Sequence, residues 1–226
     1  MSDEKRPETE TFRLVLGGYD DLAEVYDLMR KQFPRQEIYQ IRDFIQMVNK
    51  DKYKILLYRR VEDDQLIGYA TTYSMPDCKT VWLDLFAVLP EFQYQGYGQK
   101  LFDAVFQKYC GMFDGLLLCS ERVDPSDPEK AKIQQRRLEF YHKVGAYVLH
   151  TDFQLPVESG GFPMYLLFKP NRGIHGLSRE DQMRIVRNMF DYCYGHVKHR
   201  QALFQQFKDS IVDEIFQVKG KGAHHG

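Results

Sequence analysis

The sequence lacks any long apolar run and any excess of basic residues. No stretch approaches the roughly 18 consecutive apolar residues that suggest a membrane-spanning helix, so no membrane partner is expected. Lysine and arginine total 31 against 32 aspartate and glutamate residues, a net charge of −1, which gives no electrostatic reason to expect nucleic acid as a partner. The first ten residues are charged rather than apolar, so we expect no secretory signal and a cytoplasmic location.

Clusters of cysteine and histidine are also missing. The four cysteines are far apart and form no Cys-x-x-Cys pair, so neither a zinc site nor a disulfide framework is indicated. His196 and His199 are three residues apart, but no third ligand is near them in the sequence, and we predict no metal. No internal repeat is present, and 226 residues with 43% hydrophobic content suit one packed domain with an appendage.

The spacing of apolar residues predicts an α+β fold, a mixed sheet flanked by helices, in the order β-α-α-β-β-β-α-β-α-β-β. Helices are expected over about 20–32, 37–50, 99–112 and 129–144, and strands over 12–16, 53–58, 66–74, 80–88, 116–119, 147–155 and 164–169. The segment Pro170-Asn171-Arg172-Gly173 suggests a boundary between a main domain, 1–170, with a disordered tail over 1–10, and a helical extension, 171–226. The extension is predicted to form one long helix or two, with a break near Gly195.

The segment Gln93-Tyr94-Gln95-Gly96-Tyr97-Gly98 is the most informative part of the sequence. It lies between an apolar run and an amphipathic run, which indicates a strand, a glycine-bearing turn and the start of a helix. Such a turn directs several backbone N–H groups to one point, and the helix dipole adds positive potential there, so a pyrophosphate is the expected ligand. Gly96 and Gly98 lack Cβ and can take positive φ. The hexapeptide alone is equally compatible with an ordinary strand-to-helix turn.

The strand, the Gln-x-x-Gly-x-Gly turn, its helix, and a later helix ending in Phe140-Tyr141-His142-Lys143-Val144-Gly145 resemble the GCN5-related N-acetyltransferase (GNAT) superfamily. The resemblance covers about residues 12–170, and residues 85–101 carry most of it. It implies a mostly antiparallel central sheet, acetyl-CoA as co-substrate, and acetyl transfer to a primary amine of a small molecule or peptide by direct attack on the thioester. Two positions depart from the family: Ala146 replaces the usual aromatic residue, and Gln134 stands where many members have asparagine.

The same resemblance implies which residues bind the cofactor. Backbone N–H groups of Gln95 through Gln99 would hold the pyrophosphate, and the backbone of Val88 would pair with the pantetheine. In the family this strand splays from the next one, here 116–119, and a backbone N–H in it donates to the oxyanion of the reaction. The predicted cofactor-binding set is Phe86, Ala87, Val88, Gln93, Gln95, Gly96, Tyr97, Gly98, Gln99 and Gln134.

Two proton transfers accompany the reaction. Tyr141 matches the position of the family's general acid, which protonates the CoA thiolate. Reference pKa values near 10 for tyrosine and 8.5 for a thiol make that transfer uphill by about 2 kcal/mol. Deprotonating a lysine-like amine at neutral pH costs roughly 4–5 kcal/mol, and Asp84 and Glu121 are the candidate bases. The same residues are also compatible with purely structural roles. Tyr141 could be a half-buried aromatic residue on a helix, and the two acids could be solvated carboxylates at strand ends.

A second hypothesis is a catalytically inactive module of the same fold that binds CoA or a partner. Retention of Tyr141 together with both glycines favours the enzyme. The acceptor is not identified, because the segments that shape its site in the family, here near 33–39 and 158–163, mix aromatic, basic and acidic residues. The apolar stripe of the C-terminal helices must be covered by the domain or by a second subunit, and a homodimer through these helices is predicted.

Overall fold

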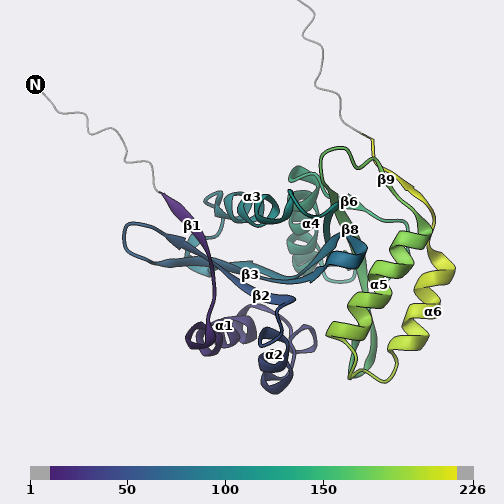
Figure 1. Cartoon of the computed structure of the whole chain (residues 1–226), viewed down its shortest axis with the longest axis horizontal. Coiled ribbons are helices and arrows are strands. Elements are labelled where there is room, and N and C mark those ends of the chain that lie inside the picture. The colour runs from purple at the N-terminus through teal and green to yellow at the C-terminus, as the bar shows by residue number, and fades with distance from the viewer. Residues whose placement is uncertain (1–10, 218–226) are drawn as a thin grey trace, which may run out of the picture. The chain divides into compact units, whose positions relative to one another are not determined.

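A computed structural model of the chain describes residues 11–217 (Figure 1), so the predicted tail over 1–10 lies outside the described residues. The chain forms two compact units: one comprises residues up to Tyr73 and Leu83–Lys108, and the other comprises Ser74–Trp82 and the residues from Tyr109 onward. The fold class is the predicted one, because the strands form a mixed, mostly antiparallel sheet and helices flank it.

The helices are α1 (Tyr19–Gln32), α2 (Ile41–Val48), α3 (Tyr97–Tyr109), α4 (Pro128–Lys143), α5 (Arg179–Cys193) and α6 (Arg200–Ser210). The strands are β1 (Phe12–Leu16), β2 (Tyr53–Arg60), β3 (Leu66–Met75), β4 (Thr80–Val88), β5 (Gly115–Glu121), β6 (Tyr147–Val148), β7 (Gln154–Val157), β8 (Gly160–Pro170), β9 (Gly176–Leu177) and β10 (Glu214–Ile215). Short 3-10 turns occupy Arg35–Glu37, Pro76–Cys78 and Pro90–Phe92.

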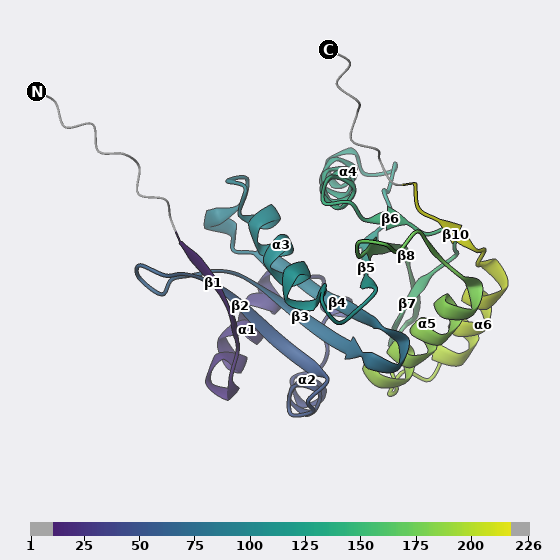
Figure 2. The ribbon, with the colours of Figure 1, turned by 45° about the horizontal axis from the view of Figure 1, so that its top comes forward.

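In the first unit, antiparallel β1, β2 and β3 lie between two layers of helix. Helices α1 and α2 cover one face of these strands and α3 covers the other (Figures 1 and 2). On the first face, the ring of Phe44 packs edge-on against Tyr53, with centroids 6.1 Å apart. The end of β4 is fixed to β3, because the Leu89 N–H donates to the Ile67 carbonyl at 2.9 Å. The end of β4 therefore has a rigid support on β3.

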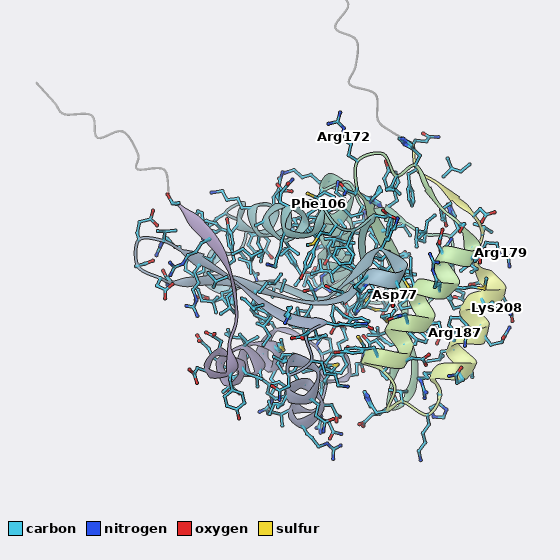
Figure 3. The ribbon with its side chains drawn as sticks, in the orientation of Figure 1. Asp77, Phe106, Arg172, Arg179, Arg187 and Lys208 are labelled. Atoms are coloured by element: carbon cyan, nitrogen blue, oxygen red, sulfur yellow. The ribbon has the colours of Figure 1, made fainter. Side chains whose placement is uncertain are left out.

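In the second unit, β5 and β8 pair antiparallel from Gly115↔Pro170 to Glu121↔Met164. The C-terminal helices α5 and α6 lie side by side in both ribbon views (Figures 1 and 2). Their apolar stripe packs within this unit, where Phe153 contacts Phe190 and Phe207 at centroid distances of 6.0 and 6.2 Å. Arg187, labelled in Figure 3, places its guanidinium 4.3 Å over the Phe204 ring.

Two predicted elements differ from the structure. The helix expected over 37–50 is a 3-10 turn followed by the shorter α2, because Gln40 is extended and Tyr39 is buried, with its carbonyl accepting from the Tyr26 hydroxyl at 2.9 Å. The strand expected over 147–155 is interrupted between β6 and β7, where the N–H groups of His150 and Asp152 donate to side chains from the C-terminal part of the chain. His150 donates to Glu214 at 2.5 Å and Asp152 donates to Ser210 at 2.8 Å. The helical extension agrees with the second predicted alternative, because it forms two helices, α5 and α6, with Gly195 between them.

Candidate acyl-transfer site

The glycine turn has the predicted strand–turn–helix form. Strand β4 ends at Val88, the turn follows, and α3 begins at Tyr97. Gly96 has φ +84°, and a Cβ built on it would meet nothing within 4 Å, so the main chain there is open to a ligand. Gly98 is the second residue of α3. Because the first N–H groups of a helix have no intrahelical partner, the turn and the start of α3 can offer them to an anion.

The side chain of Tyr97 anchors this turn to the core of the first unit. Its buried ring meets Phe12 and Phe92 edge-on, at centroid distances of 5.4 and 6.0 Å. Lys100 places its Nζ 4.9 Å from the centroid of the Phe12 ring. Tyr97 therefore contributes packing with its side chain, and its main chain forms the start of α3.

The glutamines of the turn bind main-chain carbonyls. Gln93 donates from Nε2 to the Val88 carbonyl at 3.1 Å, and Gln95 donates from Nε2 to the Glu91 carbonyl at 2.9 Å. These side chains hold the turn in shape from within. The pyrophosphate contacts predicted from the sequence involve the main chain of this turn and not these two side chains.

Tyr94 has an unfavourable backbone conformation in the middle of the turn. Its φ is +63°, in the left-handed region, while its side chain is 89% exposed. An L-residue with a bulky side chain costs about 1–2 kcal/mol in this region relative to the right-handed one. Such strain tends to persist where a functional site demands a particular backbone shape.

Replacing Tyr94 with glycine is expected to raise the melting temperature by about 1–4 °C, because glycine adopts the left-handed region without a penalty and little packing is lost, while its greater freedom in the unfolded chain offsets about half of the gain. Tyr94→Ala is the matched variant, since it removes the same ring but keeps the penalty, and no gain is expected from it. Thermal unfolding of the three proteins measures the difference. Equal melting temperatures for the glycine and alanine variants would show that the turn is not strained at this residue.

The predicted base Asp84 lies on β4 and is hydrogen-bonded to a buried tyrosine. The Tyr53 hydroxyl donates to Asp84 Oδ2 at 2.5 Å. Phe86, two residues further along β4, meets Phe102 of α3 with centroids 5.8 Å apart. The first unit therefore brings Asp84, the end of β4 and the glycine turn into one body. Tyr53 was not identified from the sequence, because no local pattern links it to a residue 31 positions away.

A second residue missed in the sequence is Gly68 of β3. A Cβ at this position would lie 2.6 Å from the Ala87 carbonyl oxygen and 3.2 Å from the Val88 Cα. The absence of a side chain is what allows the end of β4 to approach β3 so closely. An isolated glycine inside a strand pattern was the available signal for such an approach.

The other three predicted site residues lie in the second unit. Glu121, at the end of β5, is buried and accepts from Gln134 Nε2 at 3.2 Å, while Arg137 Nη1 is 3.7 Å from the same carboxylate oxygen. Gln134 is 2% exposed, and its Oε1 accepts from the Asp124 N–H at 2.8 Å. The Gln134 amide therefore ties the end of β5 to the loop that precedes α4.

Tyr141 is buried on the same face of α4 as Gln134, seven residues later. A Schellman motif ends this helix: the Ala146 N–H donates to the Tyr141 carbonyl at 2.9 Å and the Gly145 N–H donates to the His142 carbonyl at 3.0 Å. Gly145 has φ +82°, as its position in the Phe-Tyr-x-x-x-Gly pattern predicts. The glycine of this pattern thus fixes the turn of helix that carries the tyrosine.

Residues 11–217 contain no group of three or more histidine, cysteine, aspartate or glutamate side chains arranged to hold a metal ion. Within the same range, no helix has both the length and the apolar character that crossing a membrane requires.

Comparisons with known proteins agree with the resemblance found in the sequence. Residues 22–115 match the family described as Acetyltransferase (GNAT) family, which bears out the GNAT resemblance over this segment, from α1 to the first residue of β5. No curated protein sequence matches the chain.

Solved structures with the same fold include several acetyltransferases. A protein from Bacteroides thetaiotaomicron assigned to the GNAT family of acetyltransferases is 21% identical, with a TM-score of 0.63 over 81% of this chain and 98% of its own. NAA60 from Arabidopsis thaliana in complex with acetyl-CoA is 16% identical, with a TM-score of 0.54 over 72% of this chain and 100% of its own. Spermidine N-acetyltransferase from Vibrio cholerae in complex with CoA and spermine is 11% identical, with a TM-score of 0.51 over 70% of this chain and 94% of its own.

Proposed function

We propose that this chain is an acetyl-CoA-dependent N-acetyltransferase. The observation that carries the proposal is the open turn at Gly96, with its left-handed glycine at the start of α3, inside the segment that matches the GNAT family. The turn suits a diphosphate because it offers main-chain N–H groups at the positive end of a helix dipole. When bound, acetyl-CoA supplies an activated thioester for attack by an amine.

The proton transfers are assigned to residues already described. Tyr141 is proposed to give its hydroxyl proton to the departing thiolate, a role that rests on its place in the family pattern. Asp84 or Glu121 is proposed to accept the proton of the amine. Asp84 is half-buried and its carboxylate is oriented by Tyr53, whereas Glu121 is buried beside Arg137.

The acceptor is proposed to be a primary amine of a peptide or a small molecule. The structures with the same fold include a spermidine N-acetyltransferase in complex with spermine and a ribosomal-protein-S18-alanine N-acetyltransferase, so both acceptor classes occur on this fold. Cytoplasmic location and a homodimer stay predictions from the sequence. The apolar stripe of α5 and α6 is covered within the second unit, so it no longer requires a second subunit to cover it.

Acetyl-CoA at 100 times its dissociation constant is expected to stabilise the protein by about 2.7 kcal/mol, which raises the melting temperature by roughly 5–10 °C. Thiol release from acetyl-CoA is then measured with a panel of amines: spermidine, lysine and short peptides with free N-termini. Stabilisation with turnover on one acceptor class supports the enzyme and identifies that class.

The alternative is a module of the same fold that binds CoA without catalysis. Stabilisation by acetyl-CoA without thiol release on any amine would favour this module. If neither CoA nor acetyl-CoA changes the melting temperature, both functions are wrong.

A further inference from the structure

The carbonyl of Val88, the last residue of β4, accepts two side-chain hydrogen bonds. Gln93 of the glycine turn donates from Nε2 at 3.1 Å, and Gln32, the last residue of α1, donates from Nε2 at 3.0 Å. A carbonyl oxygen has two lone pairs, so both are in use. The N–H of the same peptide unit, which belongs to Leu89, donates to the Ile67 carbonyl at 2.9 Å. This peptide unit is therefore held by β3, α1 and the turn together.

The orientation of the Gln32 amide is fixed by Tyr69 of β3. The Tyr69 hydroxyl donates to Gln32 Oε1 at 2.9 Å, and burial raises the pKa of Tyr69 well above its usual range, so the hydroxyl keeps its proton. Because the Val88 carbonyl can only accept, the amide nitrogen of Gln32 must face it and the amide oxygen must face Tyr69. The hydrogen bonds thus run in one direction: the Tyr69 hydroxyl donates to Gln32, and Gln32 donates to the Val88 carbonyl.

We propose that Gln32 is a positioning residue for acetyl-CoA, acting through the main chain of Val88. The inference rests on the proposed function, because the end of β4 is where the pantetheine is expected. Gln32 lies outside the glycine motif and is 56 residues from Val88 in the sequence. With both glutamines in place, the Val88 carbonyl has no lone pair for a ligand amide. The two hydrogen bonds therefore hold the strand end in one position, and a ligand must pair with main-chain groups other than this carbonyl.

The first test is titration calorimetry of CoA into the full-length protein and its variants. Gln32→Leu is expected to weaken CoA binding about 3- to 10-fold, as the loss of one positioning hydrogen bond does. Tyr69→Phe, which leaves Gln32 without its anchor, is expected to give a smaller loss in the same direction. Gln135→Leu is the matched control, because the Gln135 amide donates to Glu139 on the exposed side of α4, and its CoA affinity is expected to equal that of the wild type.

A second variant separates positioning from a general loss of stability. Gln32→Glu keeps the shape of the side chain, but its carboxylate cannot donate to Val88, whereas the protonated acid can. The reference pKa of glutamate is about 4.3; the half-buried site and the Val88 carbonyl raise the pKa at this position, whereas the hydrogen bond from the Tyr69 hydroxyl lowers it. We therefore divide the CoA dissociation constant of Gln32→Glu by that of the wild type, and we expect this ratio to fall several-fold when the pH is lowered from 8 to 5.

The outcomes distinguish this inference from the proposed function. If the wild type binds CoA and Gln32→Leu binds it equally well, the positioning role of Gln32 is wrong while the proposed function stands. A Gln32→Glu variant that binds CoA as tightly as the wild type at pH 8, where its carboxylate cannot donate to Val88, also overturns the role. Absence of CoA binding by the wild type overturns the proposed function and the inference with it.

Discussion

Replacing Tyr141 with phenylalanine is expected to lower kcat for thiol release by about 100-fold or more, since general acid catalysis typically contributes a factor of this size. The variant removes one oxygen atom and keeps the ring, so the packing against Phe140 and the Schellman end of α4 are retained. Because Tyr141 is proposed to act only on the departing thiolate, CoA affinity is expected to stay within about twofold of the wild type. Steady-state kinetics with the acceptor found in the amine panel measures both quantities.

The dependence of kcat on pH gives a second readout. A general acid must be protonated, so the wild-type rate is expected to fall at high pH as a tyrosine with a reference pKa of about 10 ionises, and the variant is expected to lose this fall. Tyr147→Phe is the matched control, because it removes a hydroxyl that donates to the Gln217 carbonyl at 2.6 Å and has no assigned role. Activity of Tyr141→Phe above half that of the wild type would remove Tyr141 from the mechanism.

The parts of the site that depend on local sequence were predictable. The strand, the turn and the start of α3 follow from a change of apolar period around Gly96, and the end of α4 follows from Gly145. In both places the backbone needs a left-handed residue, which the sequence marks with a glycine. The predicted order of helices and strands was confirmed through α4, apart from the shortened second helix, because the apolar spacing along each element matches its type.

The parts that depend on contacts between distant segments were not predictable. A period of 3.6 residues places Gln32 on a helix, but it does not say that its amide reaches a carbonyl 56 residues away. Nor does alternation along β2 and β4 identify the contact between Tyr53 and Asp84, because register across a sheet is set by tertiary packing. The apolar stripe on α5 and α6 had to be covered by other residues, yet only the structure shows that Phe153 is one of them.

Replacing Gly68 with alanine is expected to destabilise the protein by about 1–3 kcal/mol, as overpacking of a filled core does. The added Cβ would lie 2.6 Å from the Ala87 carbonyl oxygen, 3.2 Å from the Val88 Cα and 3.0 Å from a Leu101 methyl group. Two of these atoms are main chain of β4, so the strand itself must move to relieve the collision. The melting temperature is therefore expected to fall by roughly 2–12 °C.

The same collision displaces Val88, whose main chain is the proposed partner of the pantetheine, so CoA affinity is expected to fall as well. Gly111→Ala is the matched control, because a Cβ at Gly111 meets nothing within 4 Å and its stability is expected to be unchanged or slightly raised. Equal melting temperatures for the two variants would mean that β4 can shift at little cost. A destabilised Gly68→Ala with unchanged CoA affinity would instead separate the packing role of Gly68 from the cofactor site, because a displaced Val88 could not then be part of that site.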